Sequence, residues 1–187
     1  GAKNEEISFD FAMAEAVKAG DGKSIEILMK VGPPVMGVYK GGFDGMMAQR
    51  RVMMKYGGYS QSAKKRSYFR SFVIPVVLSG EYSLRDLIGL VKGYKYVLTH
   101  MWNAVGETDF PRTCTKFDVP YFVFDGVLDQ NTPASLVQGW FDSIAAPQKE
   151  LIWFNNSGHN PMGDEPARFK SLLIDRLMSI AKKEKNV

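Results

Sequence analysis

The sequence is poor in the residues that bind metals or form covalent cross-links. Its 187 residues include one cysteine, Cys114, and two histidines, His100 and His159. A single cysteine excludes an intrachain disulfide and a four-cysteine zinc site. Two histidines leave little for a metal centre, so the chemistry of the chain has to come from other residue types.

Long apolar runs and concentrated charge are also lacking. No stretch approaches the roughly 18 apolar residues of a membrane span, and residues 1–6 have no apolar core of the signal-peptide kind. The chain carries 24 Lys+Arg against 20 Asp+Glu, and its densest basic run, residues 64–66, is short. Despite a pI of 9.1, such a dispersed excess is not the footprint of a nucleic-acid binder. We therefore expect no nucleic-acid or membrane partner and a reducing, cytoplasmic location.

The composition is that of a folded protein. Apolar residues make up 45% of the chain and charged residues 24%, which excludes a disordered chain. The length suits one domain or slightly more than one. The first residue is Gly rather than Met, which indicates processing, a tag remnant or an internal start.

The first 115 residues are predicted to be mainly helical, because apolar residues recur there with helical spacing. Three of the predicted helices begin at capping residues, namely Asp21, Asp44 and Ser83, and Asp86 completes a capping box with Ser83. The predicted helices cover residues 7–19, 21 to the break at Pro33-Pro34, 44–56, and 83 to about 105. Residues 72–78 are the best candidate for a strand in this part, although Pro75 weakens it.

From residue 116 onward the pattern alternates between strands and helices. Residues 119–124 and 151–154 are apolar on both faces, which is typical of buried strands in a parallel sheet. Residues 134–145 and 166–183 are predicted helices. This order favours an α/β domain. Two strands alone do not make a stable sheet in water. We therefore expect that the two predicted strands are part of a larger sheet.

Polar loops follow both predicted strands. The first loop, residues 125–133, contains the acids Asp125 and Asp129, and the second, residues 155–161, contains His159. Open α/β sheets place their sites at the carboxyl ends of parallel strands. An acid after one strand and a histidine after the next can meet there, and the acid then orients the imidazole. Such a pair supports the nucleophile of a hydrolase.

These loops carry a resemblance to a known family. The residues concerned are Gly126, Asp129, Thr132-Pro133, Ser157-Gly158-His159 and Asp164-Glu165-Pro166. They resemble the C-terminal end of α/β-hydrolases, most of all the proline-iminopeptidase-like branch. The resemblance implies a partial α/β-hydrolase fold, with residues 1–115 as a helical lid and residues 116–187 as the C-terminal part of the core. It also implies that Asp129 is the triad acid and His159 the general base, and it implies no metal or organic cofactor. Asp125, four residues earlier and closer to the strand end, is the competing acid.

The nucleophile expected from this resemblance is absent before the lid-like part. Family members carry a Gly-x-Ser-x-Gly elbow between an apolar strand and a helix, and a glycine-rich oxyanion segment before it. Both are expected N-terminal to residue 1. The nearest match, residues 58–62, would make Ser60 the nucleophile, and the order Ser60, Asp129, His159 agrees with the family. However, residues 50–56 before it have the pattern of a helix rather than of an apolar strand. Residues 63–66 after it are too polar for the buried helix that follows an elbow.

The lid-like part offers further candidates. His100 is predicted to be a packing or surface residue, Cys114 an inert thiol, and the methionines either core filling or an adaptable wall over an apolar substrate. Three acids are candidates for holding the free amino group of a peptide substrate, with solvated surface acids as the alternative. They are Asp44, Glu81 and Asp109.

Three functional hypotheses follow. The first is a serine hydrolase of amides or esters, aminopeptidase-like before esterase-like, which is inactive as this chain alone because it lacks the nucleophile. The second is a binding or assembly piece whose open sheet edge pairs with itself or with a partner chain that carries the N-terminal half. The third is a complete small hydrolase that uses Ser60.

Overall fold

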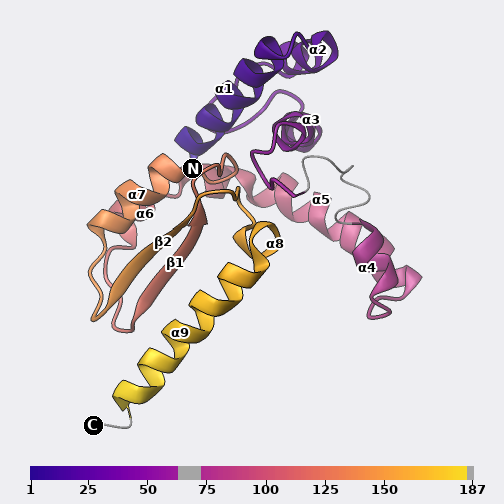
Figure 1. Ribbon diagram of the computed structural model, residues 1–187. Coiled ribbons are helices and arrows are strands. Elements are labelled where there is room, and N and C mark those ends of the chain that lie inside the picture. Colours follow the sequence, from indigo (N-terminus) through magenta and orange to yellow (C-terminus); the bar gives the residue numbers. More distant parts are fainter. Residues whose placement is uncertain (63–72, 185–187) are drawn as a thin grey trace.

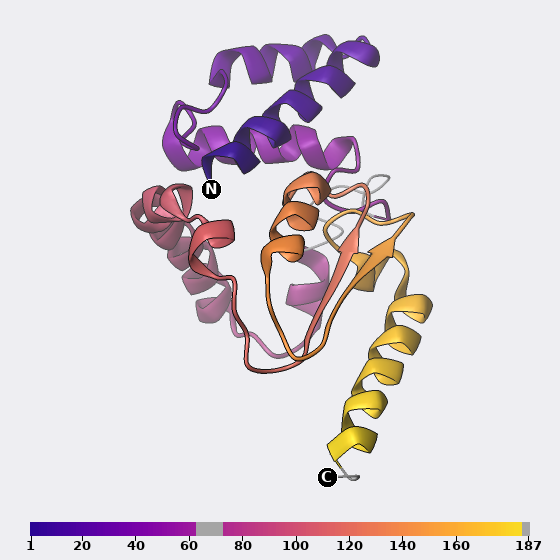
Figure 2. The same ribbon diagram turned by 90° about the vertical axis from the view of Figure 1, so that its left-hand side faces the viewer.

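The computed structural model describes residues 1–62 and 73–184 (Figures 1 and 2). The elements lie in the chain order α1 (Ala2–Lys18), α2 (Gly22–Val31), α3 (Gly42–Lys55), α4 (Ile74–Leu78), α5 (Leu84–Glu107), α6 (Phe110–Thr113), β1 (Tyr121–Gly126), α7 (Ala134–Ser143), β2 (Lys149–Phe154), α8 (Pro161–Asp164) and α9 (Pro166–Glu184). Within these residues no helix is both long and apolar enough to cross a membrane.

Helices α1, α2 and α3 pack into a bundle with its own apolar core. Phe9 of α1, Leu28 of α2 and Met53 of α3 are at most 6% exposed and belong to one cluster. The predicted cap of α2 is confirmed, because the Asp21 side chain accepts a hydrogen bond from the Ser24 amide at 3.2 Å. The apolar spacing along these segments therefore produces the helices that it predicts.

The predicted start of α3 at Asp44 is wrong. The helix begins at Gly42 and is preceded by Gly41, whose φ of 82° lies in the left-handed region. A glycine enters that region without the steric cost that a side chain would impose, so the chain turns into the helix before it reaches Asp44. Asp44 instead lies in the first turn, where its charge suits the helix dipole.

The strand prediction for residues 72–78 is also wrong. Residues 74–78 form the short helix α4, and Phe72 lies outside the described residues. Pro75 occupies the first turn of α4, where a missing N–H costs no helical hydrogen bond. The capping box of the following helix α5 is confirmed, since Ser83 and Asp86 bind each other's backbone amides.

The two predicted strands are confirmed and pair in parallel, in a register that aligns Tyr121 with Lys149 and Gly126 with Phe154. Helices cover both faces of this two-stranded sheet (Figure 1). On one face Trp140 of α7 packs edge-on against Tyr121, with ring centroids 5.9 Å apart. On the other face Phe169 of α9 lies against the rings of two strand residues, Phe124 and Phe154. The structure therefore confirms a mixed helix and strand chain with a parallel sheet, and a partial hydrolase fold stays a prediction.

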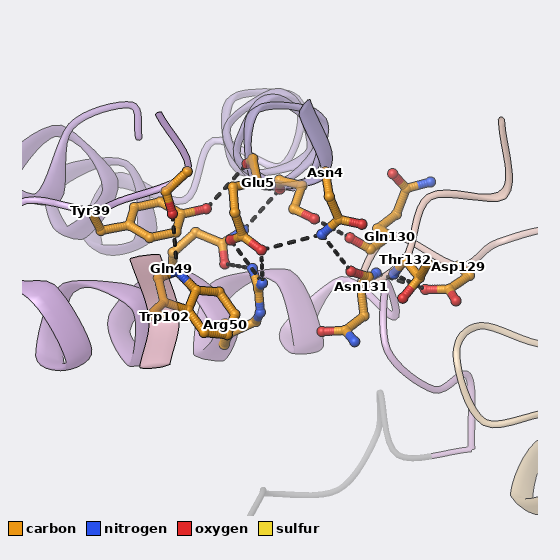
Figure 3. Close-up of polar contacts among 12 residues, drawn as sticks. Asn4, Glu5, Tyr39, Gln49, Arg50, Trp102, Asp129, Gln130, Asn131 and Thr132 are labelled. Carbon is orange, nitrogen blue, oxygen red and sulfur yellow. Dashed lines mark hydrogen bonds and ion pairs between the residues drawn. The ribbon is translucent and has the colours of Figure 1, made fainter. Parts of the chain in front are cut away.

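The helical bundle is attached to the loop that follows β1 (Figure 3). Asn4 of α1 donates to the carbonyl of Asn131 at 2.8 Å, and the Gln130 amide donates to the carbonyl of Gly58 at 2.8 Å. The Ser8 hydroxyl also donates to the carbonyl of Gln130. These bonds connect two regions more than 70 residues apart in sequence, and they set the position of the loop that holds Asp129.

Candidate active site

Asp129 and His159 meet as predicted. The Asp129 Oδ2 lies 2.8 Å from the His159 Nδ1, across the carboxyl ends of the neighbouring strands β1 and β2. Asp129 is fully buried, whereas the His159 side chain is 37% exposed. The structure thus pairs a buried acid with a partly exposed imidazole.

Backbone amides fix the orientation of the Asp129 carboxylate. Its Oδ1 accepts hydrogen bonds from the amides of Asn131 at 2.7 Å and Thr132 at 2.9 Å. These bonds occupy the oxygen that does not face the ring, so Oδ2 stays directed at the imidazole. An aspartate followed by a tight turn gives this geometry because its short side chain reaches the amides two and three residues ahead.

The surroundings of His159 favour its protonated form. The hydrogen bond to Asp129 raises the pKa of His159 above its usual value, against the opposing effect of burial. The charges of Asp129 and Asp125 raise this pKa further, and the Arg50 guanidinium lowers it. The Tyr59 ring lies beside the imidazole, with centroids 5.2 Å apart. The imidazole is therefore suited to accept a proton.

The loop that carries His159 is held by two carboxylates. The Glu165 Oε1 accepts from the Ser157 hydroxyl at 2.8 Å, and the Asp164 Oδ2 accepts from the Gly158 amide at 3.0 Å. The loop also packs closely on β1, because a Cβ at Gly126 would overlap the carbonyl oxygens of Ser157 and Gly158. This close approach explains the glycine at position 126.

Ser60 is held by a different partner. Its hydroxyl donates to the Asp164 Oδ1 at 2.6 Å, and the amides of Gln61 and Ser62 donate to the same carboxylate, each at 2.9 Å. Burial raises the pKa of Asp164, but these bonds outweigh it and hold the pKa below its usual value. The segment follows helix α3, as the sequence indicates, so the strand that an elbow needs is absent there. Residues 63–66 lie outside the described residues.

A cavity of about 910 Å³ opens beside His159 and runs under the helices. Apolar side chains from α3, α5 and α7 make up much of its wall, among them Met46, Met47, Met54, Leu98, Trp102 and Trp140. Both alternatives for the methionines occur, since Met53 fills the helical core, Met47 and Met54 line the cavity, and Met46 does both. Of the three candidate acids, Asp109 lines the cavity, while Asp44 and Glu81 do not.

A buried ion pair that the sequence analysis missed also lines the cavity (Figure 3). One terminal nitrogen of Arg50 lies 2.6 and 2.8 Å from the two carboxylate oxygens of Glu5. The two side chains are 11% and 5% exposed. No local signal reveals this pair, because its members lie 45 residues apart on α1 and α3.

The remaining sequence candidates, His100 and Cys114, do not line the cavity. His100 is exposed on α5, where its Nδ1 lies 2.7 Å from the carbonyl oxygen of Tyr96 in its own helix. Cys114 is a free, half-buried thiol. Across residues 1–62 and 73–184, no group of three or more His, Cys, Asp or Glu is placed to hold a metal ion.

Comparison with known proteins gives one informative likeness. Over 122 residues the chain is 24% identical to the probable aminopeptidase YbaC of Bacillus subtilis (strain 168). The match covers 65% of this chain but 37% of the relative, so the chain spans little more than a third of that protein's length. No protein-family profile matches the chain. No solved structure matches it either.

Proposed function

We propose that this chain supplies the acid and the general base of a serine hydrolase that cleaves amide or ester bonds, as an aminopeptidase does. The observation that carries the proposal is the contact between His159 Nδ1 and the buried Asp129, beside an open cavity. The likeness to a probable aminopeptidase supports the same class of reaction.

The proposed mechanism gives each residue one task. A serine hydroxyl supplied from outside the described residues attacks the substrate carbonyl, and His159 Nε2 accepts its proton. The imidazolium then protonates the leaving amine or alcohol, while the Asp129 carboxylate stabilises the charged ring. The raised pKa of His159 suits this role, because a stronger base takes the hydroxyl proton more readily.

The cavity favours substrates with an apolar side chain. Methionine and tryptophan side chains form much of its wall, and thioethers adapt to different shapes. Asp109 at the rim is the candidate that remains of the three acids proposed to receive a free amino group. An aminopeptidase for apolar N-terminal residues is therefore the first substrate proposal, and an esterase for small apolar acids is the second.

Co-expression tests this function. The chain is produced alone and together with the part of the Bacillus subtilis relative that lies outside the matched segment, and both are assayed with leucine p-nitroanilide and p-nitrophenyl esters. We expect turnover from the co-expressed pair and none from the chain alone. His159→Gln should lower kcat on the order of a millionfold, and His100→Gln, on exposed α5, should leave it unchanged. Turnover that survives His159→Gln, or no turnover from the pair, would contradict the proposal.

A fluorophosphonate probe separates this proposal from a complete small hydrolase. Such probes label activated serines, so peptide mapping of the treated chain reports the state of Ser60. We expect no label there, because the Ser60 hydroxyl is buried and donates to Asp164. A label at Ser60 that disappears in His159→Gln would show instead that the chain is a complete small hydrolase that uses Ser60.

The assembly hypothesis stays as a second candidate because of the exposed apolar surface. Leu173, Leu177 and Met178 of α9 are each at least 37% exposed, and the described sheet has two strands. Such a surface and such an edge invite pairing with another polypeptide. Light scattering on the chain alone tests this hypothesis, which predicts a dimer or larger species, and a clean monomer would count against self-association.

A further inference from the structure

Asp125 is a buried acid that the proposed mechanism does not use. It lies in β1, is 7% exposed, and its Oδ1 accepts a hydrogen bond from the Gly126 amide at 2.8 Å. Its Oδ2 is buried and has no hydrogen-bond partner among the described residues. An ionised carboxylate with one buried, unbonded oxygen has lost its hydrogen bonds to water there and has gained no others, which costs free energy.

A tight turn brings Asp129 back to the end of β1, because the Asp129 amide donates to the carbonyl of Gly126 at 3.0 Å, and the Asp129 carboxylate acts on the side chain of Asp125. Asp129 is already fixed, because its oxygens accept from two backbone amides and contact His159. Two neighbouring buried carboxylates do not both stay ionised, and the proton binds to the carboxylate that accepts fewer hydrogen bonds. Asp125 is that residue.

The other charged groups around Asp125 and Asp129 do not compensate the repulsion between the two carboxylates. Arg50 of α3 acts on His159, and its guanidinium is held by Glu5. On the α8 side, Asp164 accepts from Gly158, and Glu165 accepts from the loop before it. No cation among the described residues forms an ion pair with Asp125, and His159 is paired with Asp129.

We propose that Asp125 holds a proton below neutral pH and that its Oδ2 donates this proton to the Asp129 carboxylate. The Oδ1 keeps its bond from Gly126, so every polar atom of the side chain then has a partner. Asp125 touches neither the substrate cavity nor the imidazole nitrogen, so it is a positioning residue that acts through Asp129.

The arrangement makes the strength of the base depend on pH. Burial, followed by the charge of Asp129, raises the pKa of Asp125 to about 7. When the pH rises past that value, the proton leaves and a second negative charge faces His159. That charge raises the pKa of His159. The catalytic meaning of this coupling rests on the proposed function, whereas the position of the proton is a property of the chain itself.

The proton is detected directly by carbon-13 NMR of the chain labelled at the aspartate carboxyl carbons. Between pH 4 and 9 we expect the Asp125 carboxyl resonance to titrate with a midpoint near pH 7, while exposed aspartates are ionised well below pH 6. An Asp125 resonance that already has its ionised shift at pH 5 would overturn the proposal. This measurement needs no variant and no catalytic activity.

Asp125→Asn provides the matched variant, because its amide keeps both a donor for Asp129 and an acceptor for Gly126. We expect the transition near neutral pH to vanish from the carboxyl spectra, and the His159 ring resonances to titrate in one step instead of two. His100 serves as an internal reference, and the exposed Asp118→Asn serves as the control that changes nothing at His159. A transition near neutral pH that persists in Asp125→Asn would belong to another group and would contradict the proposal.

The two proposals fail separately. If Asp125 titrates as an ordinary aspartate while the co-expressed pair turns over substrate, the proton assignment is wrong and the hydrolase proposal stands. If the pair is inactive while Asp125 titrates near neutral pH, the hydrolase proposal is wrong and the shared proton stands.

Discussion

Helices α1 to α3 share one apolar cluster and pair their buried acid, Glu5, with Arg50, whereas the segment from β1 to α8 buries two acids, Asp125 and Asp129, beside a few apolar side chains. Phe9, Leu28 and Met53 fill the helical core, while Asp129 and Ser157 are fully buried beside the strands. Burying polar groups costs free energy unless each is bonded, and these groups are bonded to backbone amides and carboxylates. The comparison teaches that the helical bundle holds the main apolar cluster, whereas the strand segment holds the pair of Asp129 and His159.

The largest expected effect comes from breaking the ion pair of Glu5 and Arg50, which joins α1 to α3 and lines the cavity. Arg50→Ala leaves Glu5 buried without its cation, which we expect to lower the free energy of unfolding by about 4 kcal/mol. It should also raise the pKa of His159, because the guanidinium lowers it in the native chain. Urea denaturation and histidine NMR measure the two effects.

The double variant Glu5→Gln/Arg50→Met is the control for this prediction. Because it leaves no buried charge behind, we expect it to recover most of the lost stability. If the single variant is as stable as the native chain, the pair does not hold the two helices together.

The next effect tests the helical core itself. Leu28→Ala removes a fully buried side chain and should lower the free energy of unfolding by about 3 kcal/mol. Met29→Ala, at the next position and 71% exposed, should change it by less than about 0.5 kcal/mol. Equal losses in the two variants, measured by thermal unfolding, would show that the α1–α3 core is not formed.

Asp125→Asn tests the strand segment, with the opposite sign. The raised pKa means that the folded chain holds a proton that the unfolded chain has lost, between pH 4 and about pH 7. The native chain therefore loses stability as the pH rises through this window. The variant removes that loss, so at pH 8 it should be more stable than the native chain, and at pH 4 the two should agree. A pH-independent difference in urea denaturation would contradict this.

The smallest expected effect concerns the connection between the regions. Asn4→Ala removes the bond to the Asn131 carbonyl, which should cost about 1 kcal/mol. It should also speed amide hydrogen exchange in the loop that holds Asp129. Lys3→Ala, at the neighbouring exposed position, is the matched control, and unchanged exchange in both variants would show that this bond does not fix the loop.

Local signals in the sequence predicted local structure well. The Asp21 cap and the Ser83–Asp86 box depend on residues within one helical turn, and both form. The cap at Asp44 failed because the backbone conformation of Gly41 decides where α3 begins. The strand predicted for residues 72–78 was wrong because Pro75 suits the first turn of a helix, and residues 74–78 form α4.

The contact between the acid and the histidine could be predicted from the sequence, whereas the ion pair and the hydrogen bonds around it could not. Parallel strands bring their carboxyl ends together, so the contact between Asp129 and His159 followed from their order in the sequence. The pairing of Ser60 with Asp164 and of Glu5 with Arg50 joins residues far apart on elements without a shared pattern. The roles of such residues depend on the packing of helices, which periodicity alone does not determine.

The most direct test of the central claim is the titration of His159 by NMR in the native chain and in Asp129→Asn. The account predicts that the pKa of the native His159 lies above its usual value, and that Asp129→Asn lowers this pKa because the hydrogen bond and the charge that stabilise the imidazolium are gone. A His159 pKa at or below its usual value, unchanged in Asp129→Asn, would contradict the claim that these two residues act as one acid–base pair.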